Sequence, residues 1–152
     1  MDATPDPTPN QPAPMGQQQV ALVQESFGRV APAADAVADA FYDRLFEMSP
    51  DVRTLFPDEM GPQKKKLMQM LGMAVAGLDR PDEVVPVLQG LGSRHADYGV
   101  EERHYGDVGA ALLHTLEGGL GEEWTPDVRD AWVATWGLVS GVMIEAQRAA
   151  PT

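Results

Sequence analysis

The chain contains no cysteine, and this absence excludes several kinds of site at once. Without thiols a protein has no disulfides, no thiolate metal ligands and no cysteine nucleophile. A cysteine-free chain suits a reducing compartment, so we expect it in the cytoplasm. Long apolar runs are missing as well, and because none approaches the length of a membrane span, we expect no membrane insertion.

Basic residues are also scarce. Lys and Arg number 11 against 23 Asp and Glu, and the formal net charge is -12 at pH 7. A molecule of this charge repels phosphate backbones and anionic lipid, so neither nucleic acid nor a membrane surface is an expected partner. High solubility explains the composition most simply, and a salty habitat would favour it too.

The length of 152 residues suits one compact domain and is too short for a catalytic domain joined to a reductase. Residues 1–16 are rich in proline and lack both a basic cluster and an apolar core, so they do not have the layout of a secretory signal. We predict a disordered tail there and a folded domain over residues 17–150.

Apolar residues recur at three- and four-residue intervals through this domain, and no segment alternates with a period of two. The pattern predicts an all-α domain with six main helices and one short helix. Ser49 is the expected cap of the short helix, and Thr125 begins the last one. Asp82 is a cap candidate for a helix that Gly99 closes.

Few residues are candidates for catalysis or for binding a metal or cofactor. The sequence has no glycine-rich phosphate loop, no nucleophile elbow and no ligand spacing typical of zinc. Three histidines remain. His95 continues the apolar stripe of its helix, so it faces whatever that helix packs against, either as a hydrogen-bonded core residue or as a ligand. His104 and His114 are expected at the surface or at helix ends.

The segment "LGSRHADYGVEERHYGDVGAALLHTLEGGLGEEWTPDVRDAW" resembles the second half of bacterial single-domain globins, including the neuroglobin-like group and flavohaemoglobin-type haem domains. Earlier in the chain, "FYDRLF" and "VRTLFP" are similar to the second helix and the phenylalanine-bearing corner of those proteins, and "QKKKLMQML" is similar to their distal helix. The resemblance covers residues 17–148. It implies a globin fold, a 3-over-3 helical sandwich around a haem pocket, with haem b as the cofactor.

The resemblance also assigns roles to individual residues. His95 matches the proximal histidine, which binds the haem iron through one ring nitrogen while the other nitrogen donates a hydrogen bond. Phe56 matches the corner phenylalanine that packs on the porphyrin, and Tyr42 matches a tyrosine that leans over bound ligand. The other expected pocket residues are Gln63 and Leu67 at the sixth coordination site, Lys66 near the propionates, and Leu91 on the His95 stripe. Arg94 either reaches a propionate as well or is simply exposed.

Tyr42 and Gln63 are the residues expected to act on a bound gas. A donor beside iron-bound O2 stabilises its partial negative charge, so this pair implies slow O2 release. The alternative for Tyr42 is an ordinary core tyrosine with a satisfied hydroxyl. Because an amide is a poor ligand for haem iron, Gln63 implies an open sixth site where some relatives place a histidine.

Tyr105 matches a tyrosine that, together with a glutamate of the last helix, supports the proximal histidine in flavohaemoglobin-type globins. The place of that glutamate falls on Gln147 here. A neutral amide pushes less charge towards iron than a carboxylate, and this difference argues against peroxidase-like O–O cleavage.

Three functions follow from the resemblance. The first is binding of O2, with NO and CO as further ligands, for transport or scavenging. The second is enzymatic: NO dioxygenation with a separate reductase, or weak peroxidase activity. The third is a haem-based gas or redox sensor. We expect a monomer or a weak homodimer.

Overall fold

The structure is a computed structural model that describes residues 16–97 and 100–149, so the predicted tail, except Gly16, and Gly99 lie outside the described residues. The described part contains no strand. Its six α-helices are α1 (Gln17–Val30), α2 (Ala34–Met48), α3 (Gly61–Ala76), α4 (Pro81–Asp97), α5 (Glu102–Leu120) and α6 (Pro126–Ala149). Three short 3₁₀ helices join them: η1 (Ala31–Ala33), η2 (Pro50–Leu55) and η3 (Gly121–Glu123).

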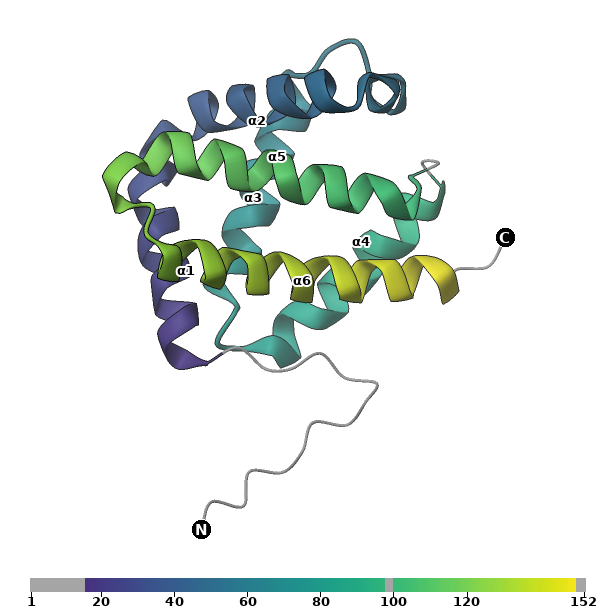
Figure 1. Cartoon of the computed structure of the whole chain (residues 1–152). Helices are drawn as coiled ribbons and strands as arrows, with labels where there is room; N and C mark the ends of the chain where they lie inside the picture. Colours follow the sequence, from purple (N-terminus) through teal and green to yellow (C-terminus); the bar gives the residue numbers. More distant parts are fainter. Residues whose placement is uncertain (1–15, 98–99, 150–152) are drawn as a thin grey trace.

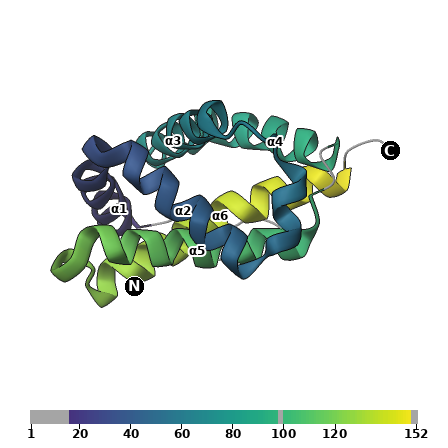
Figure 2. The ribbon, with the colours of Figure 1, turned by 90° about the horizontal axis from the view of Figure 1, so that it is seen from above.

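The helices form two layers of three. Figure 1 shows α2, α5 and α6 running across the molecule, with α3 and α4 behind them and α1 along one end. Seen from above in Figure 2, α3 and α4 lie on the side opposite α5. The main contacts between layers are α4 against α6 and α1 against α6, while α2 packs on α5 and α3. The expected 3-over-3 helical sandwich is confirmed.

The helix ends follow local sequence chemistry with two corrections. Ser49 precedes η2, but its side chain makes no capping hydrogen bond, and its hydroxyl donates to the Asp51 side chain at 2.9 Å. The Thr125 hydroxyl accepts a hydrogen bond from the Val128 amide at 3.2 Å and caps α6 as predicted. Helix α4 already begins at Pro81, so Asp82 lies in its first turn and is not the cap. A proline suits that first position because its missing N–H would have no helical partner there. Pro32 falls in η1 and separates α1 from α2.

The core is centred on Trp132 of α6, whose side chain is fully buried. Its indole N–H donates to the Ser26 hydroxyl of α1 at 2.9 Å. A buried indole that finds such a partner combines apolar burial with a satisfied donor. This pair fixes α1 against α6 at the end of the molecule away from His95.

Helices α4 and α6 lie very close together at Gly92. A β-carbon built on Gly92 would lie 2.4 Å from the Met143 carbonyl oxygen and 2.7 Å from its Cα. Real β-carbons do not come so near to backbone atoms, so only glycine permits this crossing. Gly92 stands one turn before His95, and the crossing therefore determines how His95 is placed relative to α6.

A polar cluster joins η2 to the start of α5. The Asp51 carboxylate accepts hydrogen bonds from the Arg103 guanidinium at 2.7 Å and from the Ser49 hydroxyl at 2.9 Å. The His104 Nε2 atom lies 3.5 Å from the same carboxylate, and its Nδ1 accepts a hydrogen bond from the Glu101 amide at 2.9 Å. These bonds, above all those from Arg103 and Ser49, lower the pKa of Asp51 to about 2.

None of the helices in residues 16–97 and 100–149 is long and apolar enough to cross a membrane.

Replacing Gly92 tests the close helix crossing. We expect Gly92→Ala to lower the free energy of unfolding by about 1–3 kcal/mol, because the new methyl group forces α4 away from the α6 backbone. Gly90→Ala is the matched control: its β-carbon would meet nothing within 4 Å, and alanine favours the helix. Chemical denaturation of both variants checks this. Equal stability of the two variants would contradict the crossing.

Lowering the pH tests the Asp51 cluster. The folded-state pKa of the Asp51 carboxyl, about 2, lies below the ordinary value of 3.8. The stabilisation is therefore present above pH 3.8 and is lost as the pH falls towards 2. We expect Asp51→Asn to be less stable than the wild type at neutral pH, with the two curves converging in that acid window. Asp43→Asn, an exposed substitution on α2, is the control. A difference that stays constant down to pH 2 would contradict the assignment.

Candidate functional site

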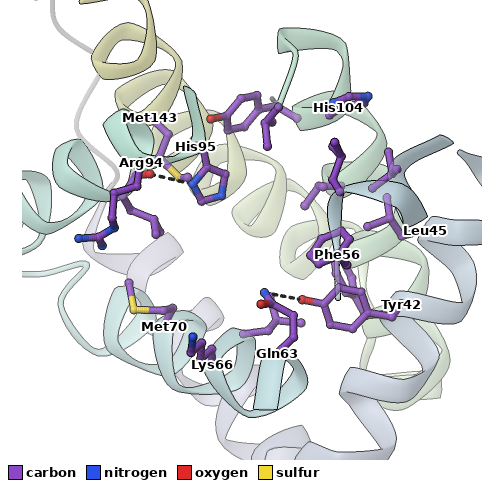
Figure 3. A pocket seen from close by; sticks show the side chains of 18 of the residues that line it. Tyr42, Leu45, Phe56, Gln63, Lys66, Met70, Arg94, His95, His104 and Met143 are labelled. Carbon is purple, nitrogen blue, oxygen red and sulfur yellow. Dashed lines mark hydrogen bonds between the residues drawn. The ribbon is translucent and has the colours of Figure 1, made fainter. Parts of the chain in front are cut away.

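A cavity of about 710 Å³ lies between the two layers, lined mainly by apolar side chains from every α-helix except α1. Its size and apolar walls are typical of a site for an organic cofactor. The structure brings together here every pocket residue that the sequence singled out: Tyr42, Phe56, Gln63, Lys66, Leu67, Leu91, Arg94, His95 and Tyr105. Figure 3 shows His95 on one wall and Tyr42 with Gln63 on the opposite wall.

His95 enters the cavity from α4. Its Nδ1 atom lies 2.7 Å from the Leu91 carbonyl oxygen one turn earlier. A carbonyl only accepts, so Nδ1 carries the hydrogen and Nε2 is the basic nitrogen of the neutral ring. Burial lowers the pKa of His95, the Leu91 bond opposes that shift, and the positive charge of Arg94 adds to it. The ring is therefore neutral near pH 7, which is the form that coordinates metals.

Tyr42 and Gln63 face the cavity from α2 and α3. The Gln63 amide nitrogen donates to the Tyr42 oxygen at 3.3 Å, and Tyr42 is only 3% exposed. Burial raises the pKa of Tyr42, while the bond from Gln63 lowers it. The phenol stays protonated, and because its oxygen accepts the Gln63 bond, its hydrogen can be donated to a molecule in the cavity.

Phe56 stands where η2 ends, and its neighbours hold it. Its ring packs edge-on against Tyr42 at 5.5 Å between centroids and against Phe46 at 5.6 Å. Such geometry is favourable for aromatic pairs. The Arg53 guanidinium ties down the same corner, because it donates to the carbonyl oxygens of Phe56 and Pro57 at 3.4 and 3.0 Å and lies 5.4 Å from the Phe46 ring centre.

The far side of His95 is closed by three linked groups. Tyr105 donates its hydroxyl to the Gln147 side-chain oxygen at 2.7 Å, and the Gln147 amide nitrogen donates to the Val100 carbonyl. The Tyr105 and His95 rings lie 6.4 Å apart between centroids. Desolvation and the charge of Glu102 raise the pKa of Tyr105 to about 12. Gln147 therefore ties α6 to α5 and to the backbone that follows α4.

Four further predicted residues take different positions along the cavity. Leu67 and Leu91 are half-buried on facing helices and supply apolar wall. Lys66 and Arg94 line the same cavity but are exposed, so their charges remain hydrated at its edge. Two cations at the edge of an apolar cavity suit a flat apolar ligand that carries acidic groups.

Sequence reasoning missed several residues that shape the site. Gly92 sets the position of α4, and Val100, Trp136 and Met143 line the cavity. Helix periodicity is the only sequence signal for Trp136 and Met143, and it does not say which cavity they face. Val100 lies between α4 and α5, outside either helix, and carries no such signal. His104 is a partial correction: it stands at the start of α5, as expected, but is 5% exposed and does not lie at the surface.

The residues present fit a haem. In the described part of the chain, no group of three or more His, Asp or Glu side chains could hold a metal ion. A metal bound by His95 would therefore need further ligands from outside such a group. A porphyrin would supply those further nitrogen ligands itself, and His95 would be the residue that holds its metal. The apolar walls, Phe56 and the two exposed cations match the ring and its carboxylates.

Comparisons with known proteins agree with this geometry. The Globin family profile matches residues 39–143. The flavohemoprotein of Bacillus subtilis is 29% identical over 118 residues, which are 75% of this chain and 29% of that protein. The flavohemoprotein of Bordetella parapertussis is 30% identical over 132 residues, 85% of this chain and 33% of that protein. The chain thus spans about a third of the flavohemoproteins it matches.

Two further proteins match over most of their own length. Neuroglobin of Dissostichus mawsoni is 30% identical over 116 residues, which are 67% of this chain and 73% of that protein. A hexacoordinated heme protein from an anhydrobiotic tardigrade shares the fold with a TM-score of 0.79 and 17% identity, over 89% of this chain and 96% of that chain. The cavity, the helix order and these matches agree, and the chain belongs to the globin family.

Proposed function

We propose that this globin holds haem b in the cavity through His95 and that its function is to bind O2 and other diatomic gases such as NO and CO. The observation that carries the proposal is the arrangement of two walls around one cavity. A neutral histidine with a basic Nε2 stands on one side, and the Tyr42–Gln63 donor pair stands on the other.

The distal pair would act on the gas by hydrogen bonding. Reduced haem iron supplies reversible binding of O2, which becomes partly negative when bound. Tyr42 is positioned to donate its hydroxyl hydrogen to such a ligand, since its oxygen already accepts from Gln63. Gln63 fixes the orientation of the phenol and can offer its second amide hydrogen. In an apolar cavity these bonds favour retention of O2 over its release.

The same two residues favour an open sixth position. Neither a protonated phenol nor a carboxamide is a good iron ligand, and burial keeps the pKa of Tyr42 raised. Lys66 is exposed, so its ammonium group would have to lose both its hydration and its proton in order to coordinate. We therefore expect none of Tyr42, Gln63 and Lys66 to compete with an incoming gas for the iron.

The proximal side favours binding over O–O cleavage. The His95 Nδ1 hydrogen goes to a neutral carbonyl, and Gln147 presents an amide to Tyr105. These neutral acceptors leave His95 a weaker electron donor than a carboxylate partner would make it. Peroxidase activity is accordingly expected to be weak.

A second candidate is NO dioxygenation, which the Tyr42–Gln63 pair also favours. The donors would hold O2 in place while NO enters the cavity, and nitrate would be the product. Each turnover oxidises the iron, so a reductase would have to restore it. Stoichiometric nitrate formation when the oxygenated protein is mixed with NO would support this use, and slow reaction would leave O2 binding as the function. A gas or redox sensor is the third possibility.

The rate of O2 release tests the distal pair. A hydrogen bond to a charged acceptor is worth about 1.5–3 kcal/mol, and this corresponds to roughly a ten- to hundredfold change in rate constant. We expect Tyr42→Phe to release O2 faster by about that factor, measured by stopped-flow displacement with CO. Gln63→Leu should accelerate release to a smaller extent, because Tyr42 then loses only its orienting partner.

Gln89→Leu makes the same amide-to-leucine change at an exposed position of α4 and serves as the control. Its release rate should equal that of the wild type. If Tyr42→Phe released O2 no faster than Gln89→Leu, Tyr42 would be an ordinary core tyrosine and the proposed distal donor would be wrong.

A further inference from the structure

The outer face of α6 carries an uncharged ridge. No charged residue occurs between Ala131 and Ile144, although the whole chain carries a formal net charge of -12. The exposed residues in this stretch are Val133, Gly137 and Gly141, spaced by four, and we call them the α6 ridge. Residues four apart stand one above the other on a helix surface, so the three form one continuous row.

The α6 ridge exposes the apolar side chain of Val133 next to two glycines, Gly137 and Gly141, which leave gaps in the helix surface. Val133 is 43% exposed, the most exposed of the large hydrophobic side chains in the described residues. A β-carbon on Gly137 or Gly141 would meet nothing within 4 Å, so the fold of a single chain does not require glycine at either place. Glycine inside a helix is unfavourable compared with alanine, yet it lets another backbone approach closely.

Charges of opposite sign stand at the two ends of the ridge. Arg129 and Glu145 continue the four-residue spacing in either direction, and both are exposed. Among the described residues, the Arg129 guanidinium makes one ion pair, a long contact with its neighbour Asp130 at 3.6 Å. In two antiparallel copies of this helix centred on Gly137, Arg129 lies opposite Glu145 of the second copy at both ends. Val133 of each copy then lies opposite Gly141 of the other.

We propose that the α6 ridge binds a second copy of this chain, with the two α6 helices antiparallel and related by a twofold axis. A twofold contact requires a surface that is complementary to itself, and the sequence from Arg129 to Glu145 has this property in both charge and size. Helices that meet along rows of residues spaced by four cross at about −50°, the commonest packing class. The Arg129–Glu145 pairs set the direction and register of the two helices. They add little to the affinity, because surface ion pairs are weak.

The net charge of the two copies opposes their association at long range. At physiological ionic strength the Debye length is about 8 Å, so most of that repulsion is screened while the contacts at the ridge persist. The structure therefore predicts a weak dimer that is weakest at low salt. The contact lies on the face of α6 away from the cavity, and the proposal does not depend on which gas the protein binds.

Charge reversal tests the pairing. Sedimentation of the haem-loaded full chain at physiological salt should show concentration-dependent dimerisation. Arg129→Glu and Glu145→Arg each place like charges opposite each other at both ends, and each should weaken self-association roughly tenfold or more. An equimolar mixture of the two variants should recover dimers of mixed composition, because every pair is again of opposite sign.

Bulk at the centre of the ridge gives an independent test. Gly137→Gln should abolish the dimer while the free energy of unfolding of the monomer stays the same or rises, since glutamine is a better helix former. Gly118→Gln is the matched control on α5, where a β-carbon also meets nothing within 4 Å, and it should leave the dimer unchanged. A monomeric wild type, or a dimer that survives Gly137→Gln and charge reversal, would overturn the proposal.

Discussion

The close contact between α4 and α6 at Gly92 is the constraint on which the site depends. Because glycine has no side chain, the Met143 backbone lies where a β-carbon would be, and α4 runs along α6 at this short separation. The carbonyl of Leu91, the residue before Gly92, accepts the Nδ1 hydrogen of His95 one turn later, and the ring presents Nε2 to the cavity. The position, direction and protonation of His95, the proposed haem ligand, thus come from backbone geometry.

The opposite wall is built from aromatic packing and two polar side chains. Phe56 and Phe46 enclose the Tyr42 ring, and Arg53 holds the corner that carries Phe56 through the backbone carbonyls. Gln63 then donates to the phenol oxygen, so the hydroxyl hydrogen of Tyr42 is left to be donated to a molecule in the cavity. Rigid apolar neighbours give this donor its direction, and the low polarity around it gives the bond its strength.

Periodicity was enough to predict the helices, and the resemblance to globins predicted nine of the residues that line the cavity. His95, Tyr42 and Gln63 stand on regular apolar stripes next to recognisable motifs, so their sides of the helices follow from the 3.6-residue repeat. Gly92 could not be predicted, because its role comes from a helix that lies far along the chain. The same holds for the Asp51–Arg103 pair, 52 residues apart, and for Gln147 and Val100, 47 residues apart.

The visible spectrum of the haem-loaded protein beside His95→Ala tests the central claim most directly. The account predicts a five-coordinate spectrum for the reduced protein, which changes to a stable oxygenated spectrum in air, and the loss or marked alteration of both in the variant. A six-coordinate reduced spectrum would reveal an internal ligand opposite His95 and contradict the open site. Failure of the wild type to take up haem would contradict the whole account.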